Sequence, residues 1–552
     1  MAAAAALSVT LAGCGGGGGG NPPPAGSTVT VSGRITFDRV PFDTVAGRGL
    51  NPDAPIESPA RQVIVEAIDA SNNAILSSTT TDAAGDYSVT VPAGRNMFVR
   101  ARAQMLKTGA APTWDFAVRN NANSDALYAL DGANFDSGSA NSTRNLRAPS
   151  GWGGASYTST RAAAPFAILD TVYRSKELVL SAAPTATFPP LNLFWSNENR
   201  PAAPFCPDDG NIGTSSYVVF GAAPDDVDEC SQPQPGEDGI YILGDFSQLD
   251  TDEFDAHVIA HEFGHYYEDR FSRSDSIGGS HGGGDRLDLR LAFGEGWGNA
   301  YSAMSLNDPA YRDSQSGVTS EFGFNLETDS NTAEGWFSEF SVGEILWDVF
   351  DPANESGDTA ALGFAPIHSV MGGPQISTDA FTSIFTFATA LQSANASSAS
   401  AIDALLDGES ISGADEFGAG EGNEGGVQGV TPVYESVGIS MPQFIFCTQP
   451  IAGTTDLNKL GNRKFFRLDI PGGGATVTIH VTGQASGPGT AATDPDIFVF
   501  RRGDLVAFSD EVTPGQETLS QVALAAGTHI LEIYDFELDA QAGRCMSMSI
   551  AG

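Results

Sequence analysis

The sequence predicts a multidomain protein in which a mixed α+β domain lies between two all-β sandwich domains. Residues 28–105 and 446–552 predict the sandwiches, because apolar and polar side chains alternate there with the period of a strand and turn residues separate the runs. The residues between them contain apolar runs with helical spacing, such as Arg161–Ser181 and Ser341–Asp351, together with apolar strand runs. A chain of 552 residues is also too long for a single core.

The first residues form a short apolar segment that ends in Leu11-Ala12-Gly13-Cys14. This ending resembles the lipobox of bacterial lipoproteins, in which the signal peptidase cuts before the cysteine and the cysteine carries the lipid. The resemblance implies that residues 1–14 are a signal, that Cys14 is lipidated, and that the protein reaches the outer membrane or cell surface of a bacterium or is secreted. No Lys or Arg precedes the apolar segment, which indicates a misassigned or upstream start. The Gly- and Pro-rich residues 15–27 predict a tether.

The N-terminal sandwich is expected to contain short strands at Val29–Phe37, Gln62–Ile68 and Thr80–Pro92. The Gly33-Arg34-Ile35 opening and the turn from Thr81 to Tyr87 resemble a carboxypeptidase regulatory-like domain. The resemblance implies a spacer or binding module without catalytic residues of its own. Residues 106–150 show no clear pattern.

The stretch Asp250–Phe271 predicts one helix, with Asp250 as its N-cap and Glu253 three residues later. Inside it stands His261-Glu262-Phe263-Gly264-His265. The two histidines are just over one helical turn apart, so their imidazoles project from one face and can bind one metal ion. Glu262 beside them can take a proton from a metal-activated water. Only 7 histidines occur in the chain, so a chance match to this pattern is improbable.

The third metal ligand distinguishes the families that share this helix. The metzincin pattern requires Gly and His at the positions that Glu268 and Phe271 occupy here, so that family is excluded. Leu291–Met304 resembles the glutamate-bearing second helix of the gluzincin metallopeptidases, the thermolysin-like clan. The resemblance implies that Glu295 is the third zinc ligand. It also implies that Asn299, one turn later, stands where that clan often has a carboxylate that orients a ligand histidine.

Three other carboxylates are rivals for the third position. Glu268 lies on the same helix face, but a metal shared by His261 and His265 lies well before it along the axis, at a rise of about 1.5 Å per residue. Asp285 and Asp288 lie in or beside a Gly-rich connection, which holds a ligand less rigidly than a helix. Glu295 opens an apolar helix that can pack against the first, so it remains the preferred ligand.

Residues 106–445 are therefore expected to be a zincin metallopeptidase domain that hydrolyses peptide or protein substrates with a Zn²⁺-activated water and Glu262 as general base. The group that stabilises the oxyanion is left open between His281 and Tyr301. The strand run Ile240–Phe246 precedes the metal helix and is expected in the sheet that binds extended substrate. The alternative is a non-catalytic surface protein that uses a zincin scaffold for binding or adhesion.

The C-terminal strand runs, Lys464–Ile470 and Ala475–Val481 among them, resemble the pre-peptidase C-terminal domain of secreted bacterial peptidases. Asp494 and Asp496 are candidate Ca²⁺ ligands there. With 27 basic and 68 acidic residues the net charge is −41, which excludes nucleic acid as a partner and disfavours direct binding to anionic lipid.

Cys14 is assigned to the lipid, which leaves four cysteines and three possible disulfide pairings. The predicted domain organisation favours two local disulfides formed in an oxidising compartment. The favoured pairs are Cys206 with Cys230 and Cys447 with Cys545.

Overall fold

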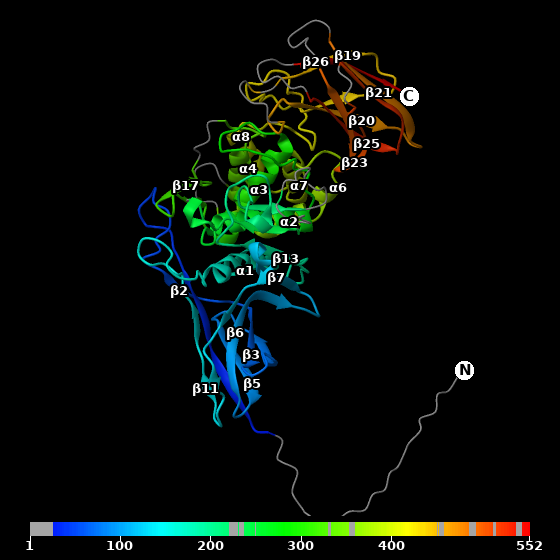
Figure 1. Cartoon of the computed structure of the whole chain (residues 1–552). Coiled ribbons are helices and arrows are strands. Elements are labelled where there is room, and N and C mark those ends of the chain that lie inside the picture. The colour runs from blue at the N-terminus through cyan, green and yellow to red at the C-terminus, as the bar shows by residue number, and fades with distance from the viewer. Residues whose placement is uncertain are drawn as a thin grey trace, which may run out of the picture.

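The computed structural model of the chain describes residues 26–219, 230, 237–248, 250–328, 333–352, 359–449, 451, 457–484, 493–511, 515–536 and 544–552. The predicted signal segment and Cys14 lie outside these residues. Figure 1 shows the N-terminal strands (blue and cyan) at one end of the molecule, the helices (green) in the middle and a β-sandwich (orange and red) at the other end. The prediction of a mixed α+β architecture is confirmed.

The N-terminal region contains a five-stranded sheet built around the long strand β1 (Thr28–Arg39). β1 pairs antiparallel with β5 and β2 and parallel with two short strands. Its buried side chains alternate with exposed ones in the first half, as the period of the sequence predicts. The partner strands are β5 (Asp86–Pro92), β2 (Ile56–Pro59), β11 (Ser142–Thr143) and β12 (Leu146–Ala148).

A second, ten-stranded sheet runs from the N-terminal region into the helical part of the molecule in the order β14-β15-β13-β7-β6-β3-β4. Short strands β8 (Ala126–Leu127), β9 (Ala129–Asp131) and β10 (Phe135–Asp136) pair with β7 or β6. The main strands are β3 (Val63–Asp69), β4 (Ile75–Thr80), β6 (Asn96–Lys107), β7 (Trp114–Asn120), β13 (Leu191–Trp195), β14 (Ser216–Val218) and β15 (Gly239–Ile242).

The domain boundary predicted between residues 105 and 106 falls inside β6. β6 pairs with β3 along most of its length and with β7 at its C-terminal end, so one sheet joins the two predicted domains. One hydrophobic core also contains side chains from both, including Val65 of β3 and Phe116 of β7. The N-terminal strands and the helical region therefore form one continuous structure.

The described residues contain eight α-helices, and α2 (Ala256–Phe271), α3 (Leu289–Leu306) and α4 (Glu339–Phe350) pack together at the centre of the molecule. α1 (Ala164–Ala182) confirms the helix expected at Arg161–Ser181, and α3 packs against both α2 and α4. The others are α5 (Phe364–Met371), α6 (Pro374–Ser377), α7 (Ile384–Ala394) and α8 (Ala399–Gly408). None of the helices in the described residues is long and apolar enough to span a membrane.

The metal helix α2 begins at Ala256, so the prediction that it begins at Asp250 is wrong. Its N-cap residue is Asp255, whose carboxylate accepts hydrogen bonds from the backbone and hydroxyl of Ser314 instead of capping its own helix. Residues 250–255 are not helical. The carboxylates of Asp250 and Asp252 instead lie in a cluster with Asp313 of a neighbouring strand. The neighbouring strands form the hairpin β16 (Ala310–Gln315) and β17 (Ser320–Asn325).

The C-terminal region is a β-sandwich with its own core, as predicted. One sheet has the order β18-β20-β25-β22-β23 and the other the order β19-β26-β21-β24. β18 (Tyr434–Val437) is part of the first sheet, so the sandwich begins about a strand earlier than the predicted residue 446. The remaining strands are β19 (Phe444–Thr448), β20 (Arg463–Ile470), β21 (Ala475–Gly483), β22 (Pro495–Arg501), β23 (Asp504–Ser509), β24 (Gln516–Leu524), β25 (Gly527–Asp535) and β26 (Arg544–Ala551).

Both predicted disulfides are confirmed. Cys206 bonds to Cys230. Cys447 of β19 bonds to Cys545 of β26, where the two residues are direct cross-strand partners. Neither disulfide joins the sandwich to the rest of the chain.

Candidate metal centre

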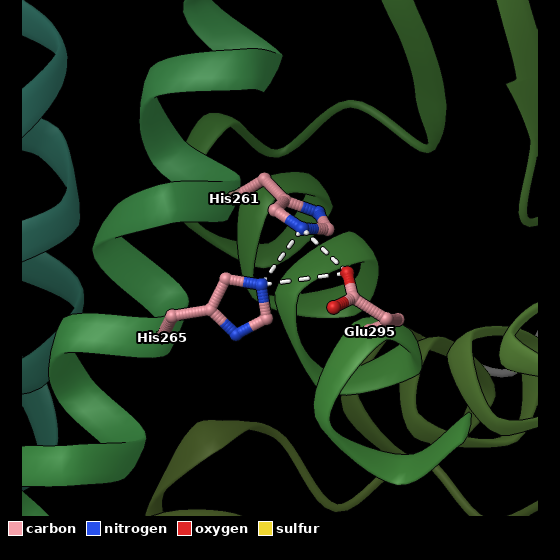
Figure 2. Close-up of side chains that lie close together, drawn as sticks. All are labelled: His261, His265 and Glu295. Carbon is pink, nitrogen blue, oxygen red and sulfur yellow. Dashed lines mark hydrogen bonds and ion pairs between the residues drawn. The ribbon is translucent and has the colours of Figure 1, made fainter. Parts of the chain in front are cut away.

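Helices α2 and α3 bring the three predicted ligands together at their crossing. Figure 2 shows the imidazoles of His261 and His265 pointing from one helix toward the carboxylate of Glu295 on the other. The two Nε2 atoms are 3.0 Å apart. Oε2 of Glu295 lies 3.2 Å from Nε2 of His261 and 3.5 Å from Nε2 of His265. The site is therefore a compact triangle of two nitrogens and one oxygen.

Small residues make this close crossing possible. A Cβ added at Gly298 of α3 would lie 2.8–2.9 Å from three ring atoms of His261, which is closer than real contacts allow. A Cβ at Gly264 of α2 would lie 3.1 Å from the Cα of Gly298. Gly264 and Gly298 thus allow the close approach of the two helices.

The triangle fits a tetrahedral metal ion. Zinc binds imidazole nitrogen and carboxylate oxygen at about 2.0–2.2 Å, which places neighbouring ligand atoms roughly 3.3 Å apart at the tetrahedral angle. The three measured separations bracket this value. Two histidines and one glutamate also match the ligand types that zinc takes in catalytic sites, where a fourth position is left for water or substrate.

Asn299 fixes the position of one ring hydrogen of His261. Its Oδ1 lies 2.9 Å from Nδ1 of His261, and an amide oxygen can only accept, so Nδ1 carries the hydrogen. This leaves Nε2, which faces Glu295 and His265, as the ring nitrogen of His261 that can bind a metal. The predicted place of Asn299 behind a ligand histidine agrees with this contact.

Glu262 lies beside the triangle and is almost fully buried. Burial raises the pKa of its carboxyl group, against the opposing charges of His261 and His265. Its Oε2 accepts a hydrogen bond of 2.6 Å from the backbone nitrogen of Tyr217 in β14. β14 is the edge strand of the ten-stranded sheet, outside β15, which was expected to occupy this region.

Tyr217 was not foreseen in the sequence. β14 has only three residues and shows no alternation, so the one available signal was its position shortly before the metal helix. The tyrosine ties the strand to α2, because its hydroxyl donates to Asp269 over 2.7 Å and accepts from Arg270. The edge strand is thereby fixed next to the carboxylate of Glu262.

His281 also reaches the centre, from the loop between α2 and α3. Its Nε2 lies 3.3 Å from Oε2 of Glu295 and 3.8 Å from Oε2 of Glu339, the first residue of α4. Burial lowers the pKa of His281, but the hydrogen bond and charge of Glu295 and the charge of Glu339 outweigh it and raise the pKa to about 9. Burial raises the pKa of Glu339 to about 7. Glu339 was not foreseen, since nothing in its local sequence marks it.

The structure does not bring the remaining candidates to the centre. The hydroxyl of Tyr301 donates to the carbonyl of Ser175 on α1, and its ring stacks on Phe263 in the core. Of the rival ligands, Glu268 lies outside the triangle, Asp285 pairs with Lys459, and Asp288 pairs with Arg290.

Among the described residues, three groups of side chains converge closely enough to hold an ion. They are the triangle, the set His281, Glu295 and Glu339 beside it, and the set Asp250, Asp252 and Asp313. The predicted calcium ligands Asp494 and Asp496 belong to none of them.

No protein-family model matches the sequence, and no curated protein matches it. Solved structures that resemble part of the chain include the pre-peptidase C-terminal domain of a collagenase from Bacillus anthracis, at 10% identity over 21% of this chain and 93% of that one, with a TM-score of 0.16. The surface-associated copper-binding protein CorA of Methylomicrobium album matches at 9% identity over 21% and 98%, with a TM-score of 0.16. A 9R-lipoxygenase from Cyanothece matches at 9% over 28% and 24%, with a TM-score of 0.13. Likenesses this weak decide neither fold nor function, so the site geometry carries the argument.

Proposed function

We propose that this protein is a zinc-dependent metallopeptidase of the gluzincin type. The observation that carries the proposal is the convergence of His261, His265 and Glu295 with Glu262 directly beside them. A binding protein has no use for a buried carboxylate next to an open metal position, whereas hydrolysis requires one. The non-catalytic alternative is therefore disfavoured.

A bound zinc ion would polarise a substrate carbonyl and lower the pKa of a water in the fourth position toward about 7. Glu262 is placed to take the proton of that water. Its raised pKa brings it closer to the operating pH, which is the condition for an efficient general base. The protonated carboxyl group of Glu262 then delivers the proton to the leaving amine.

The edge strand β14 supplies the surface for a peptide substrate. In the sheet formed by the described residues, β14 pairs with β15 on one side alone. An extended peptide can add to its other side as a further strand, with main-chain hydrogen bonds giving affinity and side-chain pockets giving specificity. Because Tyr217 binds Glu262, a peptide aligned on this edge lies next to the general base.

His281 is the candidate for stabilising negative charge on the substrate. It is a ring-nitrogen donor at the rim of the site, beside Glu295, and its side chain is 27% exposed, so a substrate can reach it. A donor aimed at the developing oxyanion contributes a large share of the rate in acyl-transfer enzymes. Tyr301 is not suited to this role, since its buried hydroxyl donates to the carbonyl of Ser175 on α1.

The export of the protein belongs to the proposal as well. Two disulfides agree with an oxidising compartment, and the Leu11–Cys14 ending suggests attachment to a membrane through a lipid on Cys14. Both features support a location outside the cytoplasm, secreted or attached to the cell surface, for the proposed peptidase.

The proposal is tested with the variant Glu262→Gln. Purified wild-type protein should hydrolyse an unstructured protein such as casein, lose this activity to a chelator and regain it with zinc. Glu262→Gln should keep stoichiometric zinc, because Glu262 is not a ligand, and lose several orders of magnitude in turnover. Near-normal hydrolysis by this variant, or no hydrolysis by the zinc-loaded wild type, would overturn the proposal.

A further inference from the structure

Four aspartates gather just before the metal helix, away from the zinc triangle. Asp250, Asp252 and Asp255 come from the segment that leads into α2, and Asp313 comes from β16. One carboxylate oxygen from each of Asp250, Asp252 and Asp313 lies within 4.8 Å of the others. The backbone bridge between Asp250 and Gln315 brings the two segments together.

Asp252 and Asp255 are buried, and Asp250 and Asp313 are half-buried. Asp252 is 3% exposed and Asp255 is 0% exposed. Oδ2 of Asp252 accepts from the hydroxyl of Ser215, and Oδ2 of Asp255 accepts from Ser314. The Oδ1 atom of each of the four aspartates is buried and has no hydrogen-bond partner.

No basic side chain in the described part of the chain compensates this charge with an ion pair to any of the four. The neighbouring Arg161 pairs with Glu253 instead. Isolated buried carboxylates are costly unless they are neutralised or bind a cation. Burial raises the pKa of each of the four carboxyl groups. Repulsion from neighbouring carboxylates adds to the rise for Asp252, Asp255 and Asp313, and the pKa of Asp313 rises to about 7.

We propose that Asp250, Asp252 and Asp313 hold a divalent cation of the calcium type, with Asp255 adding negative charge beside it. The ligands are all carboxylate oxygens, which hard cations such as Ca²⁺ prefer and zinc sites rarely consist of. Ca²⁺ fits better than Mg²⁺, because it accepts irregular oxygen shells and gives up its water more easily. The proposal does not depend on peptidase activity.

The cation would join three elements that frame the zinc triangle. Asp255 immediately precedes α2, Asp313 belongs to β16, and Ser215, which binds Asp252, immediately precedes the edge strand β14. A cation that neutralises the cluster would therefore stabilise the start of the metal helix and the position of β14. Its role would be structural, one layer away from the reacting groups.

The test uses the full chain loaded with zinc, freed of other divalent ions and then titrated with CaCl₂. Extracellular calcium sites bind with Kd values of about 10⁻⁴–10⁻³ M, so the titration should extend to about 10 mM. We expect stoichiometric bound calcium by metal analysis, unchanged zinc content, and a rise in Tm of roughly 5 °C at saturation. MgCl₂ should give a smaller rise.

Two variants and one control make the result specific. The double variant Asp252→Asn/Asp313→Asn should bind no calcium at this site and show no calcium-dependent rise in Tm. Should that variant fail to fold, the single variant Asp250→Asn, at the half-exposed edge of the cluster, should weaken calcium binding at least about tenfold. The control Asp245→Asn removes the same charge in the same segment outside the cluster and should behave as wild type.

Either of two results would overturn the proposal. One is a wild-type protein that binds no calcium and shows no change in Tm, which would mean that the carboxyl groups are neutralised by protons. The other is a double variant that still binds calcium with wild-type stoichiometry and the same rise in Tm, which would place the ion elsewhere.

Discussion

At the scale of single residues, Asn299 acts on the candidate metal centre through one hydrogen bond to His261. By accepting from Nδ1 of His261 it leaves Nε2 free to bind a metal and holds the ring in place. A carboxylate in this position would also accept, but would add negative charge behind the ligand. In the proposed zinc site the neutral amide would therefore leave His261 less basic than a carboxylate in that position would.

Asn299→Ala is expected to weaken zinc binding by about 10- to 100-fold, because the imidazole of His261 loses its fixed tautomer and orientation. Asn299→Asp should retain tight binding, since the carboxylate still accepts from Nδ1. Competition with a chelator of known zinc affinity measures both. Equal affinities for Asn299→Ala and wild type would show that this contact does not tune the site.

The sequence predicted some residues of the centre better than others, for physical reasons. His261 and His265 follow from helical periodicity alone, because four residues place two side chains on one face. Glu295 needed the family resemblance, since periodicity cannot tell which carboxylate another helix will present. Tyr217 and Glu339 come from distant segments without a local signal, so only the fold could reveal them.

At the scale of elements, the loop that carries His281 depends on a segment from far along the chain. The side-chain amide of Asn458 donates to the carbonyls of Gly278 and Ser280, over 3.0 and 3.1 Å. The ammonium group of Lys459 donates to the carbonyl of Ser280 over 2.6 Å. This segment leads into the C-terminal sandwich, so the sandwich region helps to position a residue of the site.

Lys459→Met is therefore expected to lower kcat/KM by about tenfold or more while leaving zinc content unchanged, because a shift of His281 by about 1 Å costs catalysis and not metal binding. Lys464→Met is the matched control, since that lysine is also buried but donates to the carbonyl of Gly429, away from the loop. Kinetics and metal analysis of both variants test this. An unaffected kcat/KM in Lys459→Met would contradict the positioning role.

The acidic segment before α2 gives a prediction about pH. The folded-state pKa values of its aspartates are raised, that of Asp313 to about 7, relative to ordinary values near 4 in the unfolded chain. Protonation therefore favours the folded state, and this contribution to stability is present below about pH 4 and is lost as the pH rises toward about 7.

The prediction compares the zinc-loaded wild type with Asp252→Asn/Asp313→Asn, in which two of these carboxyl groups can no longer titrate. Without calcium, as the pH rises from about 4 to about 7, the Tm of the wild type should decrease more than the Tm of the variant. Thermal unfolding of both proteins at several pH values measures the difference. A difference in Tm that stays constant with pH would contradict the raised pKa values.

The same cluster explains why α2 starts later than predicted. An N-cap pattern in the sequence cannot show that the carboxylates make a tertiary contact instead of capping the helix.

At the scale of the whole molecule, a buried charge network joins the C-terminal sandwich to α3, the helix that carries Glu295. Arg290 on α3 pairs with Asp288 over 2.9 Å and with Glu532 of β25 over 2.7 Å, and all three side chains are 2% exposed. Arg463 of β20 also pairs with Glu532. Asp288 caps α3, the helix that carries Glu295, so the network connects the sandwich with the metal centre.

Arg290→Met should destabilise the protein by about 3–5 kcal/mol, because it removes the ion-pair partner of the buried Asp288 and one of the two arginines that pair with Glu532. Arg34→Met removes an exposed pair with Asp86 and should have little effect on stability, because water screens that pair. Denaturant unfolding of the two variants tests the contrast. Similar small losses for both would show that the sandwich contributes little to the stability of the centre.

The alternating strands at both ends and the helical spacing between them predicted the three regions of the molecule. Their boundaries were predicted less well, because periodicity marks strands without showing which sheet they join. β6 reads as the last strand of an N-terminal sandwich, yet it carries the sheet into the helical region. β18 is short and falls before the predicted sandwich, although it pairs with β20.

The zinc content of Glu295→Ala tests the central claim most directly. Purified wild-type protein should contain stoichiometric zinc by metal analysis, and Glu295→Ala should lose it, because two histidines alone cannot complete the site. Glu268→Gln and Asp285→Ala remove two of the three rival carboxylates and should keep their zinc. Full zinc occupancy in Glu295→Ala, or loss of zinc in either control, would contradict the assignment of His261, His265 and Glu295 as the metal ligands.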